Sequence, residues 1–177
     1  MYTLEKIIEK CKKGNRQAGE QLYRMFSSKM FAVCIQYSKT REEAEDNLQD
    51  GFIKTLECIG QYSGKGSFEG WMKRVFINIA LEKYRKNNPV QLVEEIPDIE
   101  TEDIDAGLNI PSEVLFDFVS QLPEKYRLVF NLYVMEDLSH KEIASMLGIS
   151  DGTSKSNLAR AKEILKKKIN TYLSYEQ

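Results

Sequence analysis

Residues 138–150 read LSHKEIASMLGIS, and this stretch decides the fold. Ser139 with Glu142 three positions later forms the capping-box pattern that begins a helix. Apolar residues at helical spacing predict the inner face of that helix, at Ile143, Ala144 and Leu147. Gly148 permits the positive φ of a tight turn after it. Residues 138–165 are therefore predicted to form a helix-turn-helix, a DNA-binding motif.

The second helix of this motif is expected to begin at about Gly152. One of its stripes is apolar and consists of Leu158, Ala161, Leu165 and Ile169. The opposite side and its flanks are polar or cationic, and would present hydrogen-bonding groups to bases and phosphates in the major groove, from Thr153, Lys155, Ser156, Arg160, Lys162 and Lys167. The alternative is a helical hairpin whose charged face is only solvated.

The rest of the chain extends the helical pattern. Apolar side chains between residues 22 and 37 recur every three or four positions, which predicts one long amphipathic helix. No segment alternates as a strand does, so we predict an all-α fold. Two small helical domains, 1–88 and 112–177, are expected on either side of a linker at 89–111, which contains three of the four prolines and seven acidic residues.

The net charge of −2 conceals a segregation of charge along the chain. Residues 1–88 carry +5, residues 89–111 carry −7, and residues 112–177 balance to zero. Two stretches, 61–88 and 141–170, each carry +4. This pattern indicates two separate contacts with a polyanion rather than a non-specific polycation.

Composition argues against several classes of protein. No apolar run approaches the roughly 20 residues that span a bilayer, and the first residues lack a signal-peptide core, so we expect a cytoplasmic chain without membrane insertion. The cysteines form no CxxC pair and His140 is the single histidine, so no metal site and no cofactor is expected. No nucleophile–base pair stands out, so no catalytic residue is predicted and the chain is not expected to be an enzyme.

A helix predicted over 68–86 suggests the first of the two contacts. Its buried stripe is expected to consist of Trp71, Met72, Val75, Phe76 and Ile79. Its other face mixes cations with apolar and aromatic groups, namely Lys73, Arg74, Ile77, Asn78, Leu81, Tyr84 and Arg85. Such a face suits unpaired bases beside a phosphate track. Alternatively, Ile77 and Leu81 pack on a neighbouring helix.

The preceding helix, which begins at Arg41, is predicted to turn four apolar residues inward, namely Leu48, Phe52, Ile53 and Leu56. An acidic patch of Glu45, Asp46, Gln49 and Asp50 lies on the same helix. Because acidic groups repel DNA, this patch faces either a basic protein partner or solvent.

At this point the sequence resembles a known family, the extracytoplasmic-function (ECF) sigma factors of bacterial RNA polymerase. Residues 44–52 (AEDNLQDGF) and 66–71 (GSFEGW), followed by Asn78, Glu82 and Arg85, are similar to sigma region 2. Residues 122–127 (LPEKYR), with the motif at 138–156, are similar to sigma region 4. The resemblance covers about 16–88 and 112–170.

The resemblance implies an alternative sigma factor with three binding sites. Core polymerase, through its β′ clamp helices, would contact Asp46, Gln49, Asp50 and Phe52. The minus-ten element would be captured as single-stranded DNA by Tyr62, Lys65, Ser67, Phe68, Lys73, Arg74, Asn78 and Arg85. The minus-thirty-five duplex would be read by Ser139, Lys141, Thr153, Lys155, Ser156, Asn157, Arg160 and Lys162. Further implied partners are the polymerase β flap and an anti-sigma factor.

Two departures from the family pattern stand out. Gly51 replaces a better helix former in the stretch that would bind the clamp. Asn157 and Ala159 stand where relatives often have Arg and His, so the preferred minus-thirty-five sequence does not transfer. The competing hypotheses are a one-component regulator that uses only its helix-turn-helix, and an enzyme with a DNA-binding tail. The first leaves residues 44–86 unexplained, and the second lacks an arginine-lined serine nucleophile.

Overall fold

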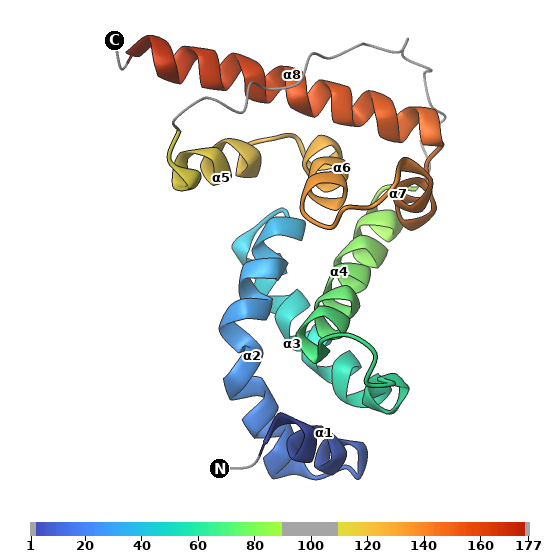
Figure 1. Ribbon diagram of the computed structural model, residues 1–177. Coiled ribbons are helices and arrows are strands. Elements are labelled where there is room, and N and C mark those ends of the chain that lie inside the picture. Colours follow the sequence, from blue (N-terminus) through green and yellow to red (C-terminus); the bar gives the residue numbers. More distant parts are fainter. Residues whose placement is uncertain (1–2, 90–109, 176–177) are drawn as a thin grey trace. The chain divides into compact units, whose positions relative to one another are not determined.

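The computed structural model describes residues 3–89 and 110–175 of the chain. Over these residues it consists of helices and connecting turns with no strand, which confirms the all-α prediction. The chain divides into two compact units, one ending at Asn87 and the other beginning at Asn88 (Figure 1). Almost all of the expected linker lies outside the described residues.

The first unit contains four α-helices and a short 3-10 helix: α1 (Leu4–Lys12), α2 (Arg16–Tyr37), α3 (Arg41–Cys58), η1 (Ile59–Gln61) and α4 (Phe68–Asn87). Helices α2, α3 and α4 pack against one another, and α1 lies against α2 and η1 (Figure 1). Large side chains from α2 and α4 fill the core, among them Leu22, Met30, Met72, Phe76 and Leu81. Each such burial contributes about 1.5–3 kcal/mol.

Side-chain caps begin two of these helices. The Asn15 side chain accepts a hydrogen bond from the Ala18 amide at 2.9 Å at the start of α2. At the start of α3, the Thr40 hydroxyl accepts from the Glu43 amide at 3.2 Å. Such caps satisfy backbone donors that have no partner within the helix, and each is worth about 1 kcal/mol.

The predicted inward face of α3 is only partly correct, because Phe52 is buried and Leu48 is half-buried but the other two residues are exposed. Ile53 is 58% exposed and Leu56 is 41% exposed, whereas the buried residues of α3 are Ala44, Asn47, Gly51, Phe52 and Thr55. These buried positions also follow helical spacing, but most are small or polar, so hydrophobicity does not mark them. Small residues at this contact let the backbone of α3 approach its neighbours closely.

The predicted stripe of α4 is also partly wrong. Ile77 and Leu81 are 3% and 1% exposed, while Trp71, Val75 and Ile79 are only half-buried. The reason is that α4 packs against both α2 and α3, so it buries two sides rather than one. Of the two interpretations open for Ile77 and Leu81, packing on neighbouring helices is the correct one.

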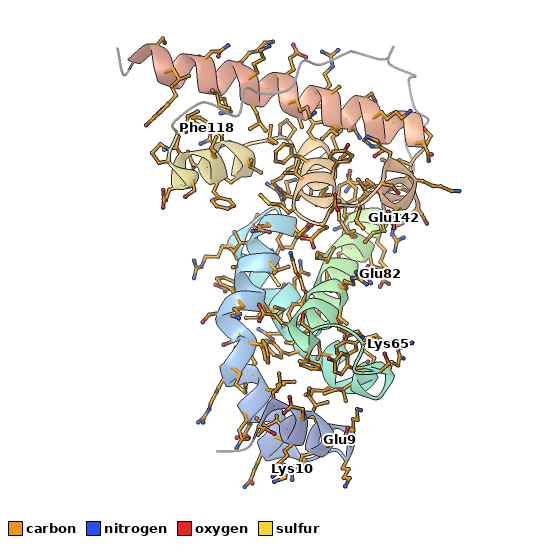
Figure 2. All side chains as sticks on the ribbon, in the orientation of Figure 1. Glu9, Lys10, Lys65, Glu82, Phe118 and Glu142 are labelled. Carbon is orange, nitrogen blue, oxygen red and sulfur yellow. The ribbon has the colours of Figure 1, made fainter. Side chains whose placement is uncertain are left out.

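The second unit contains α5 (Ser112–Ser120), α6 (Glu124–Val134), α7 (His140–Leu147) and α8 (Asp151–Tyr175). Helix α8 packs on α6 and α7 around a core that includes Leu128, Leu132, Ile143 and Ala161, all 0% exposed. Phe118 of α5, labelled in Figure 2, meets the Tyr172 ring of α8 at 6.1 Å. Helix α8 therefore packs against each of the other three helices of the unit.

Candidate functional site

The helix-turn-helix is formed by α7 and α8, as predicted. The Ser139 amide donates to the Glu142 carboxylate at 2.9 Å, and the Glu142 amide donates to the Ser139 hydroxyl at 3.3 Å, which completes the capping box. Gly148 ends α7 with φ +69°, a conformation that a side chain disfavours. The inner face of α7 is buried at Ile143, Ala144 and Leu147.

Helix α8 begins with a side-chain cap that was not predicted from the sequence. The Ser150 hydroxyl accepts from the Thr153 amide at 3.0 Å and lies 2.8 Å from the Thr153 hydroxyl. Helix α8 accordingly begins at Asp151, one residue before the predicted start. The apolar stripe of α8 is buried as predicted, at Leu158, Ala161, Leu165 and Ile169.

The candidate DNA contacts on α8 differ in accessibility. Lys155 is exposed, and Asn157, Arg160 and Lys162 are half-buried. Ser156 is only 7% exposed, because its short hydroxyl turns back and donates to the Thr153 carbonyl at 3.1 Å. The expectation that Ser156 lies open on the polar face is therefore wrong for this structure.

Arg160 is held by a carboxylate on its own helix. Its guanidinium lies 2.8 Å from Glu163, which also receives Lys167 at 2.9 Å. The hydrogen bonds from Lys167 and Arg160 lower the pKa of the Glu163 carboxyl below its usual value. Because these side chains are substantially exposed, the pairs are weak and Arg160 can leave Glu163 for another partner at little cost.

His140, at the start of α7, contacts both α8 and α6. These contacts were not predicted from the sequence. The Nδ1 of His140 lies 2.9 Å from the Ser154 hydroxyl on α8, and its ring stacks on Tyr133 of α6 at 4.9 Å. Burial of the ring lowers the pKa of His140 below 6.5, and Lys155 lowers it further. The neutral imidazole is therefore the form that this packing favours.

This packing predicts a pH dependence for the second unit. His140 has a lower pKa in the folded chain than in the unfolded chain. Below about pH 6.5 the unfolded chain therefore binds more protons, and the free energy of unfolding falls as the solution is acidified. Above that pH this contribution to stability is fully present. The native chain should have a lower melting temperature at pH 5.5 than at pH 7.5. His140→Gln should reduce this difference, since the chain has no other histidine. Equal pH shifts for both chains would contradict the assignment.

The loop before α4 is organised around aromatic rings. Tyr62, Phe68 and Trp71 lie 5.1–5.6 Å from one another between ring centroids. The Tyr62 hydroxyl donates to the Gly66 carbonyl at 2.8 Å, which closes the loop on itself. Gly64 and Gly66 have φ of +79° and +76°, so the loop requires residues that tolerate the left-handed region.

This loop and α4 present a cationic surface. Lys65 is exposed in the loop, and Figure 2 labels it there. The exposed residues of α4 include Arg74, Asn78 and Arg85, while Lys73 is half-buried. Ser67 accepts from the Gly70 amide at 3.0 Å and so caps the helix. Phe68 is only 4% exposed, because it packs between Phe26 and the loop rings, so its ring is not accessible for the predicted DNA contact in this structure.

The outer face of α3 combines acidic and apolar groups. Asp46, Gln49 and Asp50 are exposed, and Ile53 and Leu56 continue the same face at spacings of three and four residues. Phe52 is 6% exposed, because its ring packs between Tyr23 at 4.6 Å and Phe76 at 5.3 Å. The Phe52 ring is therefore not accessible for the predicted polymerase contact in this structure, whereas Ile53 and Leu56, which were not predicted as contacts, are exposed.

An apolar groove lies at the edge of this face. It has a volume of about 340 Å³ and is lined by the turn between α1 and α2 together with Tyr23, Phe52 and Leu56. Leu56 belongs to both the groove and the exposed face of α3, so the two surfaces are continuous. The α3 face consists of Asp46, Gln49, Asp50, Ile53 and Leu56.

The described residues contain no group of three or more acidic, histidine or cysteine side chains that could hold a metal ion. Over the same residues, none of the helices combines the length and apolar character that a membrane crossing requires. Burial raises the pKa of the Cys34 thiol to about 12, so this cysteine is unreactive at neutral pH.

Both units match models of known families. Residues 22–90 match Sigma-70 region 2, and residues 112–165 match Sigma-70, region 4. The chain is 27% identical over 186 residues to the ECF RNA polymerase sigma factor SigW of Bacillus subtilis, a comparison that covers 94% of this chain and 96% of that protein. The chain belongs to the ECF sigma factors. It is an alternative sigma factor that binds core RNA polymerase and directs promoter-specific initiation of transcription.

Two further proteins are similar to this chain. RNA polymerase sigma-H factor of Pseudomonas aeruginosa is 26% identical over 188 residues, covering 96% of this sigma factor and 95% of that one. Among solved structures, CnrH in complex with the cytosolic domain of CnrY is similar, with a TM-score of 0.49 and 17% identity over 93% of this chain and 96% of that chain. The match to region 2 accounts for residues that a one-component regulator would leave unexplained.

Proposed function

We propose that the α3 face is the part of this sigma factor that binds core polymerase through the β′ clamp helices. The proposal is based on the exposure of Ile53. Its apolar side chain is 58% exposed beside three exposed polar residues, Asp46, Gln49 and Asp50. An exposed apolar side chain surrounded by polar groups is typical of a protein interface, and acidic neighbours disfavour DNA. The adjoining groove would receive an apolar side chain of the partner.

We propose that the loop at 61–67 and the exposed side of α4 bind the minus-ten element as single-stranded DNA. The closed aromatic loop supplies a preformed frame, and Lys65, Arg74 and Arg85 supply positive charge around Asn78. Cationic tracks beside rigid loops suit strands whose bases are unstacked. Half-buried Tyr62 and Trp71 are the aromatic groups nearest to such a strand.

We propose that α8 reads the minus-thirty-five duplex from the major groove. Lys155, Asn157, Arg160 and Lys162 are the accessible side chains near its amino-terminal end. Thr153 is half-buried at the cap, and Ser139 and Lys141 at the start of α7 would contact phosphates, since the positive end of a helix dipole attracts anions. Each DNA contact is weak alone. Polymerase holds both at fixed spacing, so the second contact becomes intramolecular.

The protein is proposed to act in the cytoplasm as a regulatory subunit without catalytic residues of its own. The family resemblance predicts the β flap and an anti-sigma factor as further partners. The acidic segment 89–111 is proposed to thread through basic channels of polymerase, and replacement of its seven acids by Ser or Gln without effect on transcription would contradict this.

One substitution tests the separation between polymerase binding and promoter reading. Arg160→Ala should leave core binding unchanged and weaken promoter binding by the holoenzyme about tenfold, because a good side-chain contact to a base is worth about 1–3 kcal/mol. Binding is measured on a promoter fragment found by mapping the 5′ ends of transcripts. Lys166→Ala is the matched control, since Lys166 is an exposed cation of the same helix that is not among the predicted DNA contacts. Equal losses for both variants would contradict a specific role for Arg160.

A further inference from the structure

Asp50 lies where α3 meets α4. Its Oδ2 is 2.6 Å from the Nζ of Lys83 on α4, and the two side chains are 51% and 31% exposed. The next residue, Gly51, packs so closely on the Phe76 ring that no Cβ fits. This close approach of the helices keeps Lys83 within reach of Asp50.

The Asp50 carboxylate is part of the α3 face, where a basic group of polymerase would bind it. Lys83 lies on α4, the helix that carries Arg74, Asn78 and Arg85. Lys83 lies about 140–180° around α4 from those three residues, on the side that meets α3. The ion pair therefore neutralises one acidic charge of the α3 face from within the first unit.

We propose that core polymerase and Lys83 compete for the Asp50 carboxylate, so that the Asp50–Lys83 pair must open before core polymerase binds this carboxylate. The inference rests on the proposed role of the α3 face. Lysine suits such an exchange because its ammonium group is a compact charge on a flexible four-carbon stem, which can turn to a new partner without moving the helix.

The expected effect is modest, because both side chains are partly exposed and solvent weakens the pair. Lys83→Met removes the competitor and should tighten core binding about two- to fivefold. Asp50→Asn removes the shared acceptor and should weaken core binding. In the Asp50→Asn background, Lys83→Met should have no further effect, because nothing is left to compete for.

The test is a titration of core polymerase with the full chain in four forms: native, Lys83→Met, Asp50→Asn and the double variant. Lys86→Met is the matched control, since Lys86 lies on the same helix and pairs at 2.9 Å with Glu82 of that helix rather than with Asp50. Its effect should be smaller than that of Lys83→Met. Weaker or unchanged core binding by Lys83→Met, or an equal effect of Lys86→Met, would overturn the competition. If Asp50→Asn binds core normally, the role assigned to Asp50 fails first.

Discussion

Ile53→Lys is expected to weaken binding of the sigma factor to core polymerase at least about tenfold. Ile53 lies at the centre of the α3 face and is 58% exposed, so the substitution leaves the core of the first unit intact. It removes an apolar contact and places a cation where the acidic neighbours predict a basic partner. Central interface residues of this kind commonly contribute more than about 2 kcal/mol. The measurement is a titration of labelled core polymerase with native and variant chains.

Ile35→Lys is the matched control for this experiment. Ile35 is 43% exposed on α2, in the same unit but outside the α3 face. The same change of size and charge there should leave core binding within about twofold of native, as expected for a residue outside the interface. If both variants lose affinity equally, net charge rather than the α3 face governs the interaction, and the proposed binding site is wrong.

Gly51→Ala is expected to destabilise the first unit, although alanine is the better helix former by about 1 kcal/mol. A Cβ at this position would lie 2.3 Å from the Phe76 ring. That ring is 1% exposed and packs against Phe52 at 5.3 Å, so it has no room to move aside. Overpacking of a filled core costs about 1–3 kcal/mol, which corresponds to a fall in melting temperature of roughly 5–15 °C.

Thermal unfolding of the full chain measures this effect, and Gly60→Ala provides the comparison. A Cβ at Gly60 meets nothing within 4 Å, so that variant should melt within about 2 °C of the native chain, as expected for a surface site without special contacts. A Gly51→Ala chain that is as stable as native, or more stable, would mean that helix propensity outweighs the contact with Phe76. The close approach of α3 to α4 would then not require glycine.

The helix-turn-helix could be predicted from the sequence because each of its signals is local. The capping box joins residues three apart, Gly148 marks the turn by itself, and the stripe of α8 repeats within one helix. The fold class followed from helical spacing for the same reason. None of these inferences needed knowledge of which helices touch.

The errors arose where burial depends on neighbouring helices. The buried side of α3 is formed mainly by small or polar residues such as Ala44, Asn47 and Thr55, which carry no hydrophobic signal. Hydrophobic spacing therefore predicts a core position for Ile53 and Leu56, although both side chains are exposed. Phe52 and Phe68 matched family motifs, yet aromatic partners that are distant in sequence bury both.

Long-range polar pairs were equally invisible in the sequence. The contact of His140 with Ser154 joins residues 14 apart, and the pair of Lys83 with Asp50 joins α4 to α3. Spacing along one helix does not predict either contact, because the first contact joins α7 to α8 and the second joins α3 to α4.

Reconstituted transcription tests the central claim most directly. Core polymerase is mixed with the native, Ile53→Lys or Arg160→Ala chain and with sheared genomic DNA of the source organism, and transcript 5′ ends are mapped. The native chain should create a small set of start sites. These sites should be lost with Ile53→Lys, because that chain fails to bind core, and reduced with Arg160→Ala despite normal core binding. A native chain that binds core but creates no new start site, or start sites that survive Ile53→Lys unchanged, would contradict the central claim.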